Sequence, residues 1–218
     1  MSENNGGGNG ASTAAMITRL RRFAEAGPTA EAGEIEHCDL CGTELAPDHR
    51  HLLHIDERRI LCACEPCVAM RVGDGPYRPT GTRVIWLDDF AMPDDLWARL
   101  QIPIGLAFFM RSSSVDGIAG LYPSPAGATE CELDLDAWEE LCASNPALSD
   151  LEIDAEALIV DRISEPHRYV IAPIDDCYRL VGMVKANWEG ISGGDAVQRS
   201  LPQFFEELRG RTQSETGG

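Results

Sequence analysis

Cysteine and histidine offer the most chemistry in this chain, and most of them lie in one short stretch. Five of the eight cysteines fall within a window of 30 residues, and four of the five histidines lie in or beside it. Thiolate and imidazole groups are ligands that zinc and other transition metals prefer. The Gly- and Asn-rich first residues do not resemble an export signal, so the clustering favours metal ligation over disulfide bonds. The residues are Cys38, Cys41, Cys62, Cys64 and Cys67, with His37, His49, His51 and His54.

The strongest signal is a pair of Cys-x2-Cys motifs, at Cys38 and Cys41 and again at Cys64 and Cys67. Each short turn can aim two sulfurs at one ion, and Gly42 after the first suits a tight turn because glycine tolerates positive φ. The 22 residues between the motifs are long enough for a hairpin that brings the turns together. Four thiolates would complete a tetrahedral zinc-ribbon site, and such a zinc is structural because no coordination position stays open.

Cys62 is a fifth candidate thiolate next to a site that needs four. In an extended segment residues 62 and 64 point to the same side, so both can approach one centre. An iron-sulfur cluster also takes four cysteine ligands and stays open as the alternative to zinc. Among the histidines, His51 is a further candidate ligand and His37 is the natural substitute should one cysteine be absent from the site. On a strand His49 and His51 share one face, and His54 faces the other way.

The remaining cysteines, Cys131, Cys142 and Cys177, stand among apolar residues, where a cysteine behaves as a small buried hydrophobe. An enzyme built on one of them would need an exposed thiol with a lowered pKa. The sequence has no Gly-rich nucleotide fingerprint, phosphate loop or nucleophile elbow. We therefore assign no catalytic and no organic-cofactor residues.

The overall composition is that of an ordinary soluble globular protein with an unusually acidic charge. Apolar residues make up 44% of the 218 residues, and the formal net charge is -18. Such a charge opposes binding to the phosphate backbone of nucleic acids. No apolar run is long enough to span a bilayer, so we expect a cytoplasmic protein without a transmembrane segment. From 112 to 161 there are twelve Asp and Glu and no Lys or Arg. The part of this run from Glu130 to Glu140 is either a solvated face or a docking site for a basic partner.

The chain divides into five stretches by composition. We expect a disordered tail at 1–12, an amphipathic helix and linker at 13–36, the metal module at 37–80, an acidic α+β domain at 81–211, and a second tail at 212–218. The α+β class follows from strands and helices that are interspersed but do not alternate strictly. Large aromatic rings favour burial, so the domain core should contain Trp86, Trp97, Trp138 and Trp188.

Periodicity and residue type predict the elements of these two units. The module should hold strands at 51–55 and 59–62, followed by a turn-rich stretch at 73–81. The domain should hold strands at 83–87, 104–110, 117–122, 157–162 and 169–173. Its helices should lie at 94–100, 136–143, 175–188 and 195–208, with a rigid turn at 122–127.

Several strings of the sequence resemble an uncharacterised bacterial family that is frequent in actinobacteria and encoded beside high-affinity nickel-iron uptake hydrogenases. The resemblance covers nearly the whole chain after residue 36. It includes Cys62, which implies that this thiol is more than a spare one. The strings are 37–42, 50–53, 58–67, 100–109, 121–130 and 173–182.

The resemblance implies an accessory role in hydrogenase assembly, maturation or function and supplies no catalytic residues. Our first hypothesis is a zinc-binding adaptor or assembly factor that binds hydrogenase subunits or maturation factors. A second is an iron-sulfur protein that transfers electrons or handles clusters with the same cysteines. A third is a cysteine-dependent enzyme.

Overall fold

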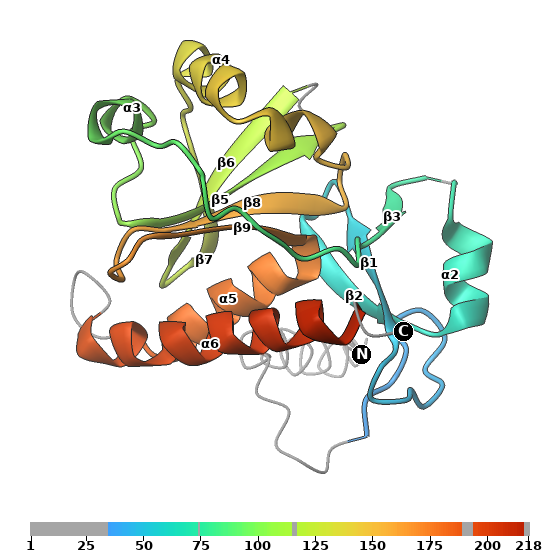
Figure 1. Ribbon diagram of the computed structural model, residues 1–218. Helices are drawn as coiled ribbons and strands as arrows, with labels where there is room; N and C mark the ends of the chain where they lie inside the picture. The colour runs from blue at the N-terminus through green and yellow to red at the C-terminus, as the bar shows by residue number, and fades with distance from the viewer. Residues whose placement is uncertain (1–34, 74, 115–116, 189–193, 216–218) are drawn as a thin grey trace, which may run out of the picture.

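The computed structural model describes residues 35–73, 75–114, 117–188 and 194–215 (Figure 1). The expected tail at 1–12 and nearly all of the expected helix and linker at 13–36 lie outside these residues. No helix of the described part is both long and apolar enough to cross a membrane.

The larger unit is built on a six-stranded antiparallel sheet in the order β4-β9-β8-β5-β6-β7. In chain order the strands are β4 (Ile85–Trp86), β5 (Leu106–Ser112), β6 (Gly117–Ser124), β7 (Gly127–Cys131), β8 (Glu156–Asp161) and β9 (Arg168–Pro173). Every residue of the central strand β8 is buried. Such a strand needs a covering layer on both faces, because its side chains alternate between them.

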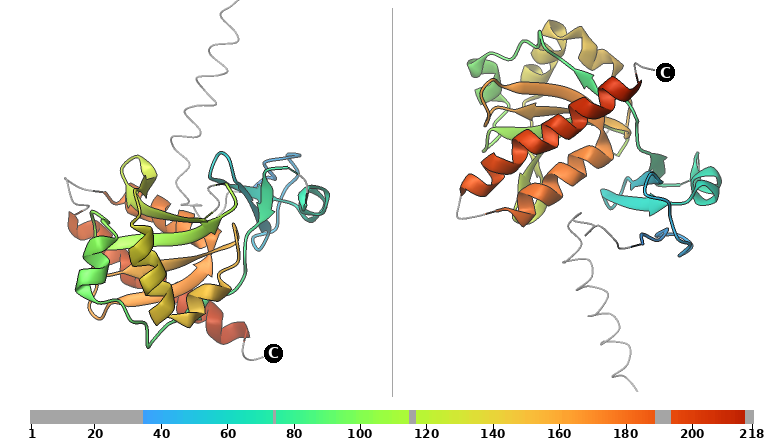
Figure 2. Two further views of the ribbon diagram at one scale, coloured as in Figure 1. Left: turned by 90° about the horizontal axis from the view of Figure 1, so that it is seen from above. Right: turned by 60° about the horizontal axis from the view of Figure 1, so that its bottom comes forward.

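Helices supply those layers on the two sides of the sheet (Figures 1 and 2). One face carries α5 (Ile174–Ala186) and α6 (Gly194–Glu215), and the other carries α3 (Asp94–Arg99), α4 (Leu135–Ser144) and the short 3-10 helix η1 (Pro146–Asp150). Successive side chains of β5 point to opposite faces of the sheet and so enter two different hydrophobic cores. Leu106, Phe108 and Met110 pack with α5 and α6, whereas Ala107 and Phe109 pack with α3 and α4.

The smaller unit is the cysteine module, with a three-stranded sheet in the order β2-β1-β3. It contains β1 (Arg50–His54), β2 (Arg59–Ala63), α2 (Glu65–Arg71) and β3 (Tyr77–Pro79). The β1-β2 hairpin is antiparallel and pairs His51 with Cys62 and Leu52 with Leu61. Leu52, Leu61, Ala63 and Val68 form a core of its own together with Cys38.

The module is packed against the larger unit. Leu53 of β1 belongs to the core on the α5 face, and Ile60 of β2 packs against that core. Two polar contacts span the same junction. Nδ1 of His51 lies 2.9 Å from Oδ2 of Asp175 in α5, and Arg58 donates to Glu130 in β7 at 2.5 Å.

The fold class is confirmed: an α+β chain with a zinc-ribbon-like four-cysteine module. The four tryptophans are buried or partly buried, as expected.

Four elements were not predicted: α2, β3, β7 and η1. The stretch at 73–81 contains β3, and the expected turn at 122–127 is a hairpin whose strands reach Ser124 and restart at Gly127. Helix α6 ends at Glu215 rather than at 208, inside the stretch expected to be a tail.

Candidate metal centre

The first Cys-x2-Cys motif forms a compact turn held by backbone hydrogen bonds. Gly42 donates to the carbonyl of Cys38 at 2.8 Å, and the amide of Cys38 donates to Thr43 at 2.8 Å. Gly42 has a φ of 76°, as the sequence predicted for this position. A side chain other than glycine is strained at such a φ. The turn therefore fixes the spacing of Cys38 and Cys41.

The second motif begins a helix instead of forming an isolated turn. Cys64 is the N-cap of α2, Pro66 lies in the first turn, and Cys67 follows within that turn. Proline suits this position because its missing N–H would have no partner inside the helix. The last residues of β2 lead directly into Cys64, so the hairpin carries the second motif to the first.

The four thiols meet, and this part of the sequence prediction is confirmed. The sulfurs of Cys38, Cys41, Cys64 and Cys67 all lie within 4.8 Å of one another. Those of Cys41 and Cys64 are 3.6 Å apart. A tetrahedral ion with bonds of about 2.3 Å would separate its sulfurs by about 3.8 Å. The arrangement thus fits a four-thiolate metal ion.

The protonation of this cluster shows why it suits a cation. Burial raises the pKa of Cys38, but amide hydrogen bonds from Cys64, Leu40 and Cys41 outweigh it and lower that pKa to about 6. Hydrogen bonding with the Cys64 thiol, together with burial, raises the pKa of Cys67 to about 12. Neighbouring thiolates repel one another, so all four can ionise together only when a positive ion neutralises them.

Cys62 does not join the four thiols but lies in a second group with His49 and His51. The ligand atoms of this group also lie within 4.8 Å of one another. His51, like Cys62, was a candidate ligand of the four-cysteine centre, and the structure places both in the separate group. His37 is exposed and belongs to neither group of the described residues. His54 accepts from the amide of Glu57 at 3.2 Å and stacks edge-on against Tyr77.

Two acidic residues that the sequence analysis did not single out position this second group. Asp39 ties the first motif to β2, because its amide donates to the carbonyl of Cys62 at 2.9 Å and its carboxylate accepts from the Cys62 amide at 2.7 Å. Asp175 accepts from His51. That hydrogen bond and a second with Cys62 raise the pKa of His51 to about 10. Asp39 lies inside the motif and was open to inspection, whereas Asp175 is 124 positions from its partner.

The cysteines outside the module differ in exposure. Cys177 is fully buried, and burial raises its pKa well above the ordinary range. A thiol that is buried and protonated is a poor nucleophile, which argues against an enzyme built on Cys177. Cys131 and Cys142 are only partly buried, and burial raises the pKa of each. The expectation of full burial is therefore right for Cys177 alone.

The acidic run is only partly a free surface. Glu130 pairs with Arg58, Glu140 pairs with Arg99, and Asp134 caps α4 by accepting from the amide of Ala137. Glu132, Asp136 and Glu139 remain exposed and have no ion pair among the described residues. The negative face is thus smaller than the composition of the run implies.

Comparison with known proteins gives a family but no function. Residues 37–212 match DUF5947, a family of unknown function. The chain belongs to this family. The match spans both the module and the larger unit, as the resemblance seen in the sequence implied for the chain after residue 36. No curated protein and no solved structure matches the chain.

Proposed function

We propose that this member of DUF5947 is a metal-binding accessory protein whose four-cysteine centre holds a structural zinc ion and which acts by binding another protein. The observation that carries the proposal is the meeting of four thiols at tetrahedral spacing. Four thiolates fill every position of a tetrahedral ion and leave none for a substrate. A centre of this kind stabilises the fold of the module, and with it the module surface, and does not turn over a substrate.

Zinc is preferred to an iron-sulfur cluster because the ligands come from two separated short turns, which is the common geometry of structural zinc. The fifth thiol, Cys62, is engaged in its own group and is not a cluster ligand in this arrangement. Absorption separates the two metals. Protein with zinc at this centre is colourless, and an iron-sulfur protein is brown.

The surface near the module supports a binding role. Met70 and Val72, at the end of α2, are 76% and 51% exposed. Single exposed apolar residues are common on protein surfaces. Met70 and Val72, however, follow closely on Cys67, and a structural ion bound by Cys64 and Cys67 would hold α2 in place. The exposed carboxylates of Glu132, Asp136 and Glu139 offer a second contact, to a basic surface.

For the partner we propose a subunit or maturation factor of a nickel-iron hydrogenase. This step rests on the family resemblance described for the sequence. The test is capture of the tagged full chain, at low salt, from cells that make both proteins. Wild type should retain hydrogenase components, and Met70→Asp with Val72→Asp should release them. Ile85→Asp, at an exposed apolar position on the edge strand β4 and away from α4, is the control for adding a charge.

Two further measurements test the metal centre and the accessory role separately from the capture experiment. Elemental analysis should show at least one zinc equivalent fewer in Cys41→Ser than in wild type, which tests the centre independently of the partner. Deletion of the gene should lower hydrogenase activity. Absence of hydrogenase components at low salt, together with unchanged activity after deletion, would contradict the accessory role.

A further inference from the structure

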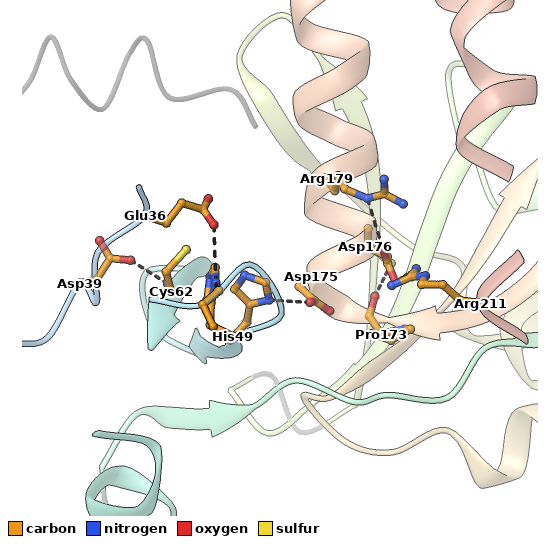
Figure 3. A network of polar contacts seen from close by, with 12 residues as sticks. Glu36, Asp39, His49, Cys62, Pro173, Asp175, Asp176, Arg179 and Arg211 are labelled. Carbon is orange, nitrogen blue, oxygen red and sulfur yellow. Dashed lines mark hydrogen bonds and ion pairs between the residues drawn. The ribbon is translucent and has the colours of Figure 1, made fainter. Parts of the chain in front are cut away.

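A second cluster of metal-binding side chains lies on the face of the module that is turned toward α5. His51 and Cys62 are directly opposite each other across the β1-β2 ladder. His49 lies just before β1, and its ring meets the His51 ring edge-on with centroids 4.8 Å apart. Leu53 and Ile60 continue this face into the core of the larger unit. The cluster therefore sits at the junction of the two units (Figure 3).

Both imidazole rings are held by their Nδ1 atoms. Nδ1 of His51 is 2.9 Å from Asp175 Oδ2, and Nδ1 of His49 is 2.8 Å from the carbonyl of Ala46 and 3.5 Å from Glu36 Oε2. A carbonyl oxygen and a carboxylate can only accept, so each Nδ1 carries the proton. Binding of an ion releases any proton on Nε2, so each ring would offer its lone pair from that atom. Histidines that ligate metals are held in this way by a carboxylate or a carbonyl.

Among the described residues, the Nε2 atom of His49 has no hydrogen-bond partner. The His49 side chain is only 6% exposed, and this atom is buried. A buried polar atom without a partner costs about 1–3 kcal/mol, so native proteins rarely leave one unsatisfied. The His49 ring belongs to the group in which a nitrogen of each imidazole and the Cys62 sulfur all lie within 4.8 Å of one another. A cation bound by all three residues would satisfy the Nε2 atom of His49.

We propose that His49, His51 and Cys62 form a second metal site, distinct from the four-cysteine centre, for a divalent transition-metal ion of borderline softness such as Zn²⁺ or Co²⁺. Two imidazoles and one thiolate suit such ions, whereas Mg²⁺ and Ca²⁺ take oxygen ligands. The ligand atoms are close enough that small side-chain rotations place them around one ion. Three protein ligands leave the fourth tetrahedral position open for water or an exogenous ligand, unlike the first centre.

Both imidazoles of the group border a cleft between the two units. The cleft has a volume of about 260 Å³ and is lined by His49, His51 and Asp175, together with Thr80 and Arg211. An ion at the proposed site has one protein ligand fewer than an ion bound by four cysteines. It should therefore exchange faster, and a chelator should remove it first.

The same residues allow one other interpretation, in which Asp175 and His51 activate Cys62 as a nucleophile. Such a relay needs a thiol, an imidazole and an orienting carboxylate. It gives no role to His49, which belongs to the same group. The metal site accounts for all four residues and is the interpretation that the contacts favour.

The test is metal stoichiometry of the full-length, tag-free protein after chelation and reloading with Co²⁺ or Zn²⁺. Wild type should bind two equivalents, and His49→Ala and Cys62→Ser one each. The Co²⁺ form of Cys62→Ser should lose only part of the sulfur-to-cobalt absorption. Asp175→Asn should weaken the second site about 10- to 100-fold and leave the first unchanged, as loss of a hydrogen bond to a ligating histidine does.

Matched controls separate this site from the first centre and from unfolding. His54→Ala, on the opposite face of β1, and Cys142→Ser, in α4, should keep two equivalents. Cys41→Ser should lose the first ion and, because the module then unfolds, the second ion with it, whereas His49→Ala and Cys62→Ser should keep the first ion, so failure of the second site is visible alone. Limited proteolysis of 37–80 reports whether the module remains folded in each variant, and tryptophan fluorescence reports on the larger unit. One equivalent in wild type, two in Cys62→Ser, or alkylation of Cys62 at the same rate with and without metal would overturn the proposal.

Discussion

Leu52 and Leu53 are neighbours on β1, yet their side chains pack into different hydrophobic cores. Leu52 belongs to the core of the module, with Cys38 and Val68, and Leu53 belongs to the core of the larger unit. Both are fully buried, at 0% and 1% exposure. The alternation of side chains along a strand places one residue in each core. The β1 strand is thus shared by the two units.

This relationship gives a matched pair of substitutions. Leu52→Ala and Leu53→Ala remove the same atoms from adjacent buried positions, and each should cost about 2–5 kcal/mol. Leu52→Ala should weaken metal binding at the four-cysteine centre and leave the tryptophan unfolding transition nearly unchanged. Leu53→Ala should shift that transition, because all four tryptophans lie outside the module. Identical effects of the two variants on both readouts would show that the cores do not respond separately.

Removal of the first metal ion should unfold the module locally. Binding of a structural zinc ion contributes on the order of 10 kcal/mol to the folding of a small metal module. Cys38→Ser should therefore open 37–80 to limited proteolysis while the fragment from about 81 to 211 persists. Cys131→Ser, a partly buried cysteine of β7, is the control. Loss of the tryptophan signal together with the module would mean that the two parts unfold as one cooperative unit.

The segment that leaves the module is anchored by an ion pair between Arg83, whose side chain is 47% exposed, and the buried Glu156. Nε and Nη2 of Arg83 donate to the two carboxylate oxygens at 2.7 and 2.6 Å. Removing Arg83 leaves the buried carboxylate without compensation and should cost about 2–3 kcal/mol, less than removing a partner from a fully buried pair, because solvent screens the exposed guanidinium.

Arg83→Met should lower the free energy of unfolding by that amount in urea denaturation. Adding Glu156→Gln should restore part of the loss, because the buried charge is gone. Arg78→Met, which removes hydrogen bonds to the exposed carbonyls of Gly75 and Tyr77, should cost much less. A double variant that is no more stable than Arg83→Met would contradict the buried-charge explanation.

A close approach inside the large sheet explains Gly120 in β6. A methyl group there would lie 2.8 Å from Sγ of Cys131 and 3.3 Å from Cε1 of Phe109. Gly120→Ala should therefore destabilise the fold by about 1–3 kcal/mol through overpacking. Cys131→Ala removes the nearer atom, so the double variant should regain part of this in thermal unfolding. Strictly additive losses would show that the contact with Cys131 is not the cause.

The sequence predicted those elements that are marked by the spacing of residues close together in the chain. The paired Cys-x2-Cys motifs identified the four thiols that meet, and Gly42 marked the turn between them. In the stretch 175–188, where a helix was expected, Cys177, Leu180, Val181 and Val184 recur at helical spacing, and all four are buried in α5. These signals depend on spacing within one turn or one helix, which the sequence displays directly.

The elements and contacts that were missed depend on distant partners. The three-residue strand β3 is defined by pairing with β1, and β7 by pairing with β6. Neither has the length or alternation that marks a strand by itself. The assignment of Cys62 and His51 to a group of their own depends on the hairpin register and on Asp175 of a distant helix. No local pattern carries that information.

The last prediction concerns the exposed carboxylates of α4, which we propose as a contact for a basic partner. Asp136 and Glu139 are exposed on a helix that covers one face of the sheet, and α6 covers the other. Asp136→Asn with Glu139→Gln should weaken capture of the partner and flatten its salt dependence, since exposed charges are screened over about 8 Å at physiological ionic strength. The matched control is Asp195→Asn with Glu206→Gln on α6, which also removes one first-turn aspartate and one exposed glutamate. Capture measured across a salt series should fall for the α4 pair alone. An equal loss for both pairs would indicate that net charge, and not this face, governs association.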